Sequence, residues 1–564
     1  MTTITNHGRP WAPFAVALVS TTALLGGCGG NDNSDNNSGS TNPTVAAISC
    51  AELAGKTVPA SQIGLPTGGA TVTAATAVKS SDSGNTNGDY CKVTGTIAPD
   101  ATVAATGTPV INFQLNLPET WNGKSVHMGG GGYNGTVVTG TTAVSFAPGS
   151  VPLAQGYATF GSDSGHVGNS ATADFALNEG ALLNFGYQHL KKTRDTALAL
   201  IKLRYAKPVD KSYFAGASTG GREGMTVVER FPTDYDGVIA NAPAIYFWGM
   251  RLIGIRIGQA AYATPGGFIP TAKLDLLRKT AIDACDSDDG AADRIISNVE
   301  ACRAKQSAII TQLRCPNGAD TGATCLSDAQ LNTARAISDD VVLPYQLAFG
   351  VNRYPGYNLF QGADFGHGLG MGSSATAVSP PTVAANGYLY TQGDNYLKYL
   401  ITKDPAFNSL AFNINSPGQY QQSLVQSSDV VGAMNPDTSA FRARGGKLIV
   451  LQGLADDAVS PNGTITYYQD QVSRYGQSAV SSFFRLYTVP GFGHGIGEFV
   501  PSWDAMGALD RWVSQGTAPE TLVGTDTNSA SSGRSRPLCV YPGFPRYSGS
   551  GDLNAAASYR CATQ

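Results

Sequence analysis

The sequence predicts an α/β fold in which a mostly parallel sheet carries helices on both faces. Runs of strand-forming residues alternate with helical patterns, and many of these runs end in Gly-rich or acidic loops. The alternation stops between about Tyr246 and Met434 and resumes at Lys447, which indicates a large insertion. Functional loops of such a sheet lie at the carboxyl ends of its strands. We therefore expect the polar residues that follow the strands to meet at one edge of the sheet.

Length and composition favour an exported globular protein of more than one lobe. The chain has 564 residues, of which 42% are hydrophobic, so a sizeable core is expected. Charged residues make up only 14% of the chain, and the net charge is -4 with no basic stripe. These features argue against nucleic-acid binding.

The first 45 residues are predicted to direct export rather than to fold. Arg9 precedes a mostly apolar stretch, 11–25, that ends in Leu25-Gly26-Gly27-Cys28, so residues 1–28 have the form of a signal peptide. The cysteine resembles a bacterial lipobox, which predicts lipidation at Cys28; ordinary secretion with cleavage nearby is the alternative. Residues 29–45, rich in Asn, Ser and Gly, are predicted to be a flexible linker. The protein is expected to be an outer-membrane lipoprotein, or periplasmic or secreted.

Eight of the nine cysteines remain when Cys28 is set aside, and an even number in an oxidising compartment predicts disulfides. Eight cysteines permit 105 pairings. We favour pairing of nearest neighbours, which would join Cys50 to Cys91, Cys285 to Cys302, Cys315 to Cys325, and Cys539 to Cys561.

The predicted strands can be placed one by one along the chain. The segments with strand character are 125–128, 157–160, 213–215, 237–240, 447–451 and 483–489, and the clearest helical patterns are 185–204 and 503–513. The predicted domains are therefore a core of residues 46–245 and 435–564 and a lid of residues 246–434. A lid inserted at this point would overhang the carboxyl ends of the strands.

The segment Gly216-Ala217-Ser218-Thr219-Gly220 follows the third of these strands and precedes a helical run. Its G-x-S-x-G form is that of a nucleophile elbow, a sharp turn that lifts the serine hydroxyl clear of the sheet. The pattern alone is weak, because Gly and Ser are abundant in this chain. A serine nucleophile also needs a base within hydrogen-bond reach.

His494 is the candidate base, since it follows the last predicted strand in a Gly-rich loop. Asp456 follows the preceding strand and is the candidate carboxylate, with Asp457 as its rival. The order Ser218, Asp456, His494 is the chain order of the α/β-hydrolases. Each residue alone has a simpler explanation as a cap or a surface group, and the three together favour a catalytic triad.

Two backbone amides are predicted to bind the oxyanion that such a reaction forms. The N–H of Thr219 is adjacent to the nucleophile. The second donor is expected from the run 129–132, which resembles the oxyanion loop of esterases; we choose Gly132, with Gly131 as the close alternative.

The acidic segment 286–295 predicts a structural calcium site within the lid. Oxygen donors recur every two or three residues around Gly290, which suits a hard cation of high coordination number. It is not an EF-hand, because the glutamate at position twelve is absent. The expected ligands are the carboxylates of Asp286, Asp289 and Asp293 and the main-chain carbonyls of Ala291 and Ile295. The alternative is an acidic, solvated turn.

These motifs together resemble the tannase and feruloyl esterase family, over roughly Cys50 to Cys561. The matching pieces are 129–135, 162–166, 218–224, the acidic segment, 453–456 with Pro461, and 490–494. The eight cysteines also fit the structural disulfides of that family. The resemblance implies an α/β-hydrolase core, a calcium-binding lid and hydrolysis of esters of aromatic acids.

One departure from the family pattern is sharp. Relatives usually carry a cysteine just before the serine and another just after the histidine, bridged to each other, and here these positions are Ala217 and Gly495. A bridge closing so long a loop would contribute about 4–5 kcal/mol in the chain-entropy model. Packing alone must then hold Ser218 near His494, and we hypothesise a looser active site.

The predicted function is a serine esterase that hydrolyses feruloyl, galloyl or terephthalate-monoester substrates through an acyl-enzyme. Two alternatives are an esterase for short aliphatic or polyester-derived esters, and a non-catalytic ligand-binding surface lipoprotein on a hydrolase scaffold. The expected partner is a small aromatic ester, with membrane contact only through a lipid anchor and no oligomer. Lys398 would pair with a distal carboxylate of an acidic substrate or simply lie on the helix surface.

Overall fold

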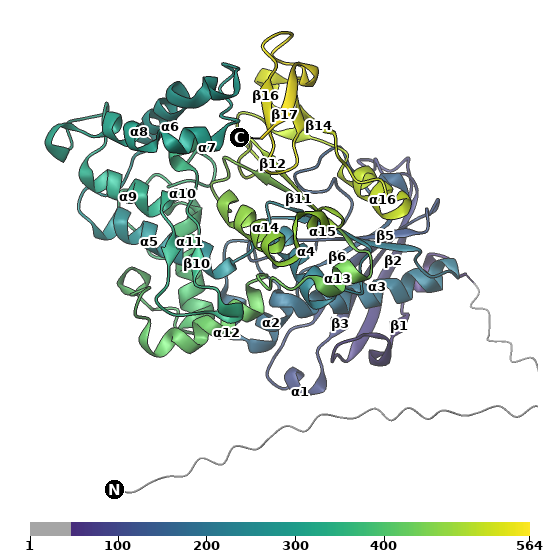
Figure 1. The fold of residues 1–564 in the computed structure, drawn as a ribbon. Coiled ribbons are helices and arrows are strands. Elements are labelled where there is room, and N and C mark those ends of the chain that lie inside the picture. The colour runs from purple at the N-terminus through teal and green to yellow at the C-terminus, as the bar shows by residue number, and fades with distance from the viewer. Residues whose placement is uncertain (1–46, 564) are drawn as a thin grey trace, which may run out of the picture. The chain divides into compact units, whose positions relative to one another are not determined.

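The computed structural model describes residues 47–563, and a ten-stranded sheet lies at its centre (Figure 1). The strand order is β1-β2-β3-β4-β6-β5-β7-β8-β11-β12. The bounds are β1 Thr57–Val58, β2 Gly69–Val78, β3 Tyr90–Ala98, β4 Ile111–Pro118, β5 Lys124–Met128, β6 Ala158–Ser162, β7 Lys211–Ala217, β8 Gly237–Asn241, β11 Lys447–Gly453 and β12 Phe484–Val489.

The sheet has an antiparallel part and a parallel part. Strands β1 to β4 pair antiparallel, and β4 pairs antiparallel with β6. From β6 to β12 every neighbouring pair is parallel. All residues of β6, β8 and β12 are buried, as expected for strands covered on both faces. The predicted α/β fold class is therefore correct.

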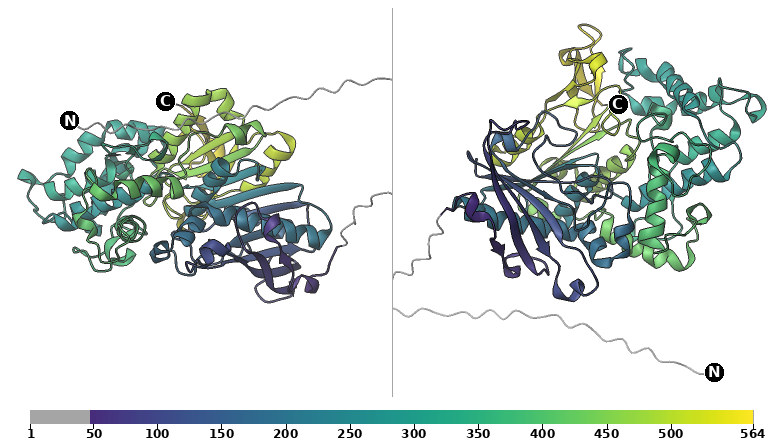
Figure 2. Two further views of the ribbon diagram at one scale, coloured as in Figure 1. Left: turned by 90° about the horizontal axis from the view of Figure 1, so that it is seen from below. Right: turned by 180° about the vertical axis from the view of Figure 1, so that it is seen from behind.

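Helices cover both faces of the parallel part, as the two views of Figure 2 show. Phe214 of β7 packs in the same apolar cluster as Met225 of α4, whereas its neighbour Tyr213 packs with Met506 and Leu509 of α16 on the opposite face. The helices outside the insertion are α1 Ala101–Ala104, α2 Glu179–Leu183, α3 His189–Tyr205, α4 Thr219–Arg230, α14 Pro461–Tyr475, α15 Gln477–Ser481 and α16 Ala505–Gln515.

Two of the predicted helices differ from the structure at their N-terminal ends. The helix expected from residue 185 begins earlier, because α2 leads without a break into a π-helical turn, Asn184–Gln188, and then into α3. The helix expected from residue 503 begins at Ala505, because the Asp504 side chain accepts the hydrogen bond of the Gly507 amide and caps the first turn.

The chain between β8 and β11 contributes no strand to the central sheet in the described structure, and it packs beside the core (Figure 1). Its apolar residues belong to the same buried cluster as α4, so the two regions share one core. Its elements are α5 Phe247–Gly258, α6 Thr271–Cys285, α7 Val299–Ala304, α8 Gln306–Leu313, α9 Asp328–Ser338, β9 Val341–Val342, β10 Arg353–Tyr354, α10 Val383–Asn386, α11 Tyr388–Asn395, α12 Gln421–Val431 and α13 Ser439–Ala443.

The C-terminal segment adds two small sheets, built from β13 Pro501–Ser502, β14 Leu522–Asp526 and β15 Ser535–Leu538, and from β16 Phe544–Tyr547 and β17 Tyr559–Ala562. Four disulfides join Cys50 to Cys91, Cys285 to Cys302, Cys315 to Cys325, and Cys539 to Cys561. This is the nearest-neighbour pairing, and such bridges fit an exported protein. The predicted signal peptide, the linker up to residue 45 and Cys28 lie outside the described residues.

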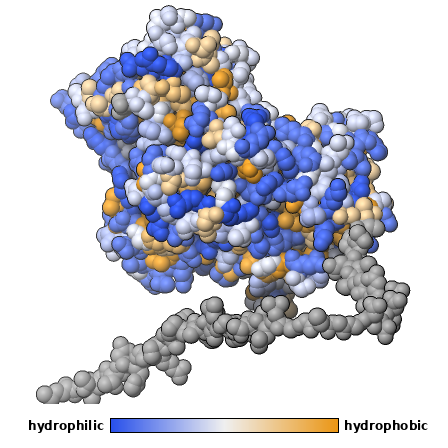
Figure 3. Space-filling model, turned by 45° about the vertical axis from the view of Figure 1, so that its right-hand side comes forward, coloured by the Kyte–Doolittle hydropathy of each residue, from blue (hydrophilic) through white to orange (hydrophobic). Residues whose placement is uncertain are grey.

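The surface offers no extended apolar face in the view of Figure 3, where apolar residues lie scattered among hydrophilic ones. Within residues 47–563, no helix has both the length and the apolar character needed to cross a bilayer.

Candidate active site

Ser218 occupies a strained turn between β7 and α4. Its backbone has φ 59° and ψ −120°, a conformation that costs free energy for a non-glycine residue. The Ser218 amide donates to Asn241 O at 3.0 Å, and the Ala244 amide donates to Ser218 O at 3.0 Å. These bonds to the end of β8 hold the turn in the form of a nucleophile elbow.

Ser218, His494 and Asp456 lie within hydrogen-bond distance of one another at the carboxyl ends of β7, β12 and β11. His494 Nε2 is 3.0 Å from Ser218 Oγ, and His494 Nδ1 is 3.0 Å from Asp456 Oδ2. A carboxylate can only accept, so Nδ1 donates to Asp456 and Nε2 is left to accept from the serine hydroxyl. This tautomer is the one a general base requires.

Asp456 is fully buried and its orientation is fixed by the backbone. Its Oδ1 accepts the amides of Ala458 and Val459, each at 2.8 Å. Burial acts to lower the pKa of His494, but the charge of Asp456 and its hydrogen bond to the imidazole outweigh burial, and the net shift is upward. Asp456 therefore favours the imidazolium that forms when His494 accepts a proton.

The rival carboxylate, Asp457, makes no hydrogen bond to His494 in the described structure. Its Oδ2 is buried and has no hydrogen-bond partner among the described residues. Burial raises the pKa of Asp457 to about 7, and the adjacent Asp456 charge adds to this shift. The structure thus brings Asp456, and not Asp457, into contact with His494.

The Gly-rich loop after β5 packs directly on the elbow. The Gly220 amide donates to Gly130 O at 2.8 Å, and a methyl group on Gly220 would lie 2.8 Å from that oxygen, so only glycine fits. Buried Glu223 accepts the Gly130 amide at 3.0 Å and the Asn134 side-chain amide at 2.6 Å. Helix α4 therefore positions this loop.

The amides of Gly131, Gly132 and Thr219 donate to no acceptor within residues 47–563. Thr219 Oγ1 donates to Gly132 O at 2.5 Å, which joins the two predicted oxyanion donors. Gly132 has φ +57°, and a methyl group there would lie 2.3 Å from Ser170 O. Unpaired amides beside a serine hydroxyl suit a developing negative charge. Gly131 stays an alternative to Gly132 as the second oxyanion donor.

Phe146 lies against His494 beside Gly495, and nothing in the sequence pointed to this contact. Its ring meets the imidazole edge-on, with centroids 5.2 Å apart. Gly495 has φ +88°, and a methyl group on it would lie 3.1 Å from Phe146 Cε1. An aromatic contact therefore takes up space beside the histidine loop.

A restored bridge, Ala217→Cys with Gly495→Cys, is expected to raise the free energy of unfolding by clearly less than the ~4–5 kcal/mol of the chain-entropy model. The reason is that a side chain at residue 495 must adopt a left-handed backbone and displace Phe146. Denaturant unfolding of the oxidised and the reduced double variant measures the gain, and the reduced form isolates the cost of the substitutions. A gain of the full ~4–5 kcal/mol in the free energy of unfolding would contradict the strain expected at residue 495. An unchanged profile of ester substrates would contradict the hypothesis of a looser active site.

The other described histidines do not reach Ser218. His127 is buried in β5 with its Nδ1 2.8 Å from Tyr235 Oη, and His189 is buried in α3 with its Nδ1 2.6 Å from Asn184 O. His166 stacks on Phe175, and its Nε2 lies 2.9 Å from Tyr133 O, so it shapes the loop after β6. Lys398 is engaged by Asp394 at 2.9 Å, so it is not a free cation for a substrate carboxylate.

The acidic segment forms a tight turn after α6 that suits a hard cation. Asp289 is 1% exposed, and burial raises its pKa to about 6; burial also raises the pKa of Asp286. Oδ2 of Asp288 is buried without a partner within residues 47–563. Crowded, desolvated carboxylates of this kind fit calcium. The ligand oxygens of Asp286, Asp289 and Asp293 do not all lie within 4.8 Å of one another, so binding would draw them together.

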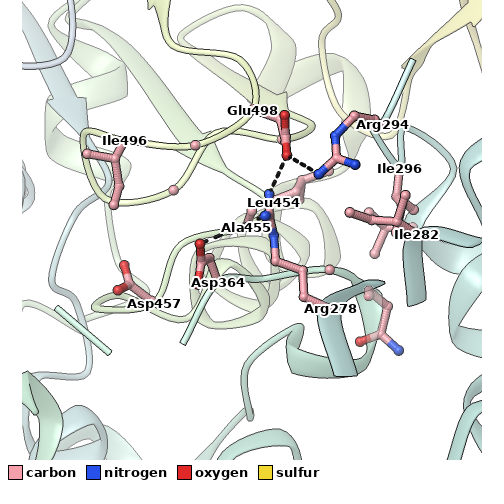
Figure 4. A pocket seen from close by; sticks show the side chains of 16 residues that line it. Arg278, Ile282, Arg294, Ile296, Asp364, Leu454, Ala455, Asp457, Ile496 and Glu498 are labelled. Atoms are coloured by element: carbon pink, nitrogen blue, oxygen red, sulfur yellow. Dashed lines mark hydrogen bonds and ion pairs between the residues drawn. The ribbon is translucent and has the colours of Figure 1, made fainter. Parts of the chain in front are cut away.

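A cavity of about 210 Å³ lies beside the triad loops (Figure 4). It is bounded by Ala455, Asp457, Gly493 and Ile496 on the core side and by α6 and the acidic segment on the other, and it does not include Ser218. Glu498 accepts hydrogen bonds from Arg278 at 2.8 Å and Arg294 at 3.0 Å across it.

A serine on a strained elbow, a histidine and an aspartate at the ends of successive parallel strands define the class of the α/β-hydrolases. A model of the family described as tannase and feruloyl esterase matches residues 91–562. The chain therefore belongs to the tannase and feruloyl esterase family, and it is a carboxylic ester hydrolase.

Similar proteins match over nearly their whole length. An uncharacterized esterase of Agrobacterium fabrum is 42% identical over 92% of this chain and 94% of its own. The mono(2-hydroxyethyl) terephthalate hydrolase of Piscinibacter sakaiensis is 32% identical over 84% of this chain and 85% of its own length. The crystal structure of feruloyl esterase B from Aspergillus oryzae aligns with a TM-score of 0.72 at 23% identity, covering 91% of this chain and 100% of that chain.

Proposed function

We propose that this protein is a serine esterase that hydrolyses esters of aromatic carboxylic acids through an acyl-enzyme. The observation that carries the proposal is the hydrogen-bonded series from Ser218 through His494 to Asp456, with separations of 3.0 Å at both steps. The family and the terephthalate-monoester hydrolase among its relatives support the aromatic acyl group.

In this mechanism Ser218 Oγ attacks the ester carbonyl carbon while its proton passes to His494 Nε2. The amides of Thr219 and Gly132 donate to the oxyanion of the tetrahedral intermediate. Collapse releases the alcohol, which takes the proton from His494. Water, deprotonated by His494, then attacks the acyl-enzyme and frees the acid and Ser218.

A panel of aryl and alkyl esters tests the acyl preference. Methyl ferulate, methyl gallate and mono(2-hydroxyethyl) terephthalate are expected to give higher kcat/KM than short aliphatic methyl esters. Preference for the aliphatic esters would instead favour the polyester-derived class. No hydrolysis of any ester, with no labelling of Ser218 by a fluorophosphonate, would favour a ligand-binding lipoprotein.

We also propose that the acidic segment 286–295 binds a structural calcium ion through Asp286, Asp289, Asp293 and the carbonyls of Ala291 and Ile295. A bound ion would balance the buried carboxylates and fix the turn that the Cys285–Cys302 bridge encloses. The further proposals are a lipid anchor at Cys28, a monomer, and a small aromatic ester as the partner, with no nucleic acid.

Removal of calcium with a chelator is expected to lower the melting temperature. A site held at a hundredfold excess of calcium over its Kd contributes about 2.7 kcal/mol to stability. Asp289→Asn should abolish the calcium-dependent part of the shift, measured by thermal unfolding with and without added Ca²⁺. The matched control is Glu300→Gln, since Glu300 is an exposed acid that forms its ion pair with Arg303 and lies outside the acidic segment. An equal calcium shift in both variants would contradict the site.

A further inference from the structure

Asp275, Asp364 and His367 form a compact group of metal-ligating side chains outside the catalytic machinery. Their ligand atoms lie within 4.8 Å of one another, and within residues 47–563 no other group of three histidine, cysteine or acidic side chains meets this distance. Asp275 lies in α6, whereas Asp364 and His367 come from the chain that follows Gln361. Residues 89 positions apart (364 minus 275) are therefore brought together by the fold.

We propose that these three side chains bind a divalent transition-metal ion, of which Zn²⁺ is the best fit. His367 Nδ1 lies 3.2 Å from Asp364 Oδ2 and 3.7 Å from Asp275 Oδ1. Ligand atoms bound to zinc at about 2.0–2.2 Å are separated by roughly 3–3.6 Å in tetrahedral or octahedral geometry. The two separations from His367 are close to these values, and the two carboxylates lie within 4.8 Å of each other, so an ion would hold the three side chains near their present positions or draw the carboxylates closer.

The donor set decides the class of metal. An imidazole nitrogen with two carboxylates suits zinc, cobalt or nickel, whereas calcium takes oxygen ligands only. The orientation of the Asp364 side chain is fixed, because its Oδ1 accepts the amides of Gly366 at 3.0 Å and His367 at 3.1 Å. The His367 side chain is 57% exposed, which leaves room for water to complete the coordination.

One positive charge faces the group. Arg278 Nη1 lies 3.9 Å from Asp364 Oδ2, and its Nη2 donates to Glu498 at 2.8 Å. Glu498 also accepts from Arg294 at 3.0 Å, so it offsets only part of the Arg278 charge.

The ion would attach α6 to a Gly-rich segment next to the catalytic loops. A methyl group on Gly368 would lie 2.6 Å from Ile496 Cδ1 and 3.8 Å from Asp457 Oδ2, so this segment touches both. Figure 4 shows Asp364, Asp457 and Ile496 on the same side of the cavity. A bound ion would thus fix the segment that contacts the loop of His494.

The test uses untagged full-length protein, stripped of metal, saturated with Ca²⁺ and with the Cys28 thiol alkylated so that it cannot bind zinc. Calorimetric titration with Zn²⁺ is expected to show one ion bound, which excess Ca²⁺ does not displace. Co²⁺ should give visible absorption bands of a nitrogen- and oxygen-ligated ion. Hydrogen exchange of the amides in 364–372 should slow when zinc binds.

His367→Ala and Asp275→Asn should each weaken zinc binding by about tenfold or more. The matched control is Asp283→Asn, an exposed acid on the same helix that pairs with Lys279 and should leave binding unchanged. Absence of zinc binding by the wild-type protein, or unchanged affinity in His367→Ala, would overturn the proposal. Calcium-dependent stability should survive in His367→Ala, which separates this site from the acidic segment.

Discussion

Replacing Ser218 with alanine is expected to lower kcat for ester hydrolysis by a factor on the order of 10⁶. The loss is large because the variant removes the atom that forms the acyl-enzyme while His494 and Asp456 stay in place. The fold should survive, since Ser218 Oγ contacts only His494 in the described structure and the strained turn is held by main-chain bonds. Initial rates with methyl ferulate and a p-nitrophenyl ester measure the effect.

Ser164→Ala is the matched control for this variant. Ser164 also follows a parallel strand and also has a left-handed backbone, with φ 61°, but its hydroxyl donates to Asp163 O. A fluorophosphonate probe should label the wild-type protein and Ser164→Ala but not Ser218→Ala. Wild-type activity in Ser218→Ala would refute the mechanism, whatever the substrate.

Asp456→Asn is expected to lower kcat by about 10⁴. An asparagine side chain can offer its N–H₂ to His494 Nδ1, which would place the imidazole proton on Nε2 and leave no acceptor for the serine proton. Asp457→Asn tests the same change one residue later, where the described structure shows no hydrogen bond from the side chain to His494. Its loss of kcat should be far smaller. Equal losses in the two variants would contradict the assignment of Asp456.

The pH dependence of kcat/KM is also expected to change in Asp456→Asn. Asp456 raises the pKa of His494 against the opposing effect of burial, and activity needs the neutral imidazole. Activity in the wild-type protein is therefore lost as the pH falls through this raised pKa. Without the charge of Asp456 the pKa falls, so the acid limb of any residual kcat/KM should move to lower pH. A limb that moves upward would show that Asp456 does not stabilise the imidazolium.

Much of the candidate site follows from sequence order, because local patterns carry it. The elbow, the Gly-rich run after β5 and the loops after β11 and β12 each follow a buried strand, and parallel strands bring their carboxyl ends to one edge. The disulfides are equally local, since each cysteine pairs with its neighbour along the chain. The insertion is visible as the stretch in which the strand–helix alternation stops.

The tertiary structure alone decided the contacts between segments with no shared pattern. Phe146 meets His494, and a lid segment containing Gly368 touches Ile496, although no periodicity or motif links these positions. Glu223 accepts the Gly130 amide across the elbow, and no sequence pattern links these two residues.

The choice between Asp456 and Asp457 also separates what the sequence determines from what the tertiary structure decides. The sequence placed two carboxylates after β11, and only the backbone geometry after that strand lets one of them, Asp456, form the hydrogen bond to His494. A strand pattern determines which residues reach the edge of the sheet, because hydrogen bonding and burial act along the chain. The direction of each side chain in the loops depends on packing against distant segments, and the local sequence does not encode that packing.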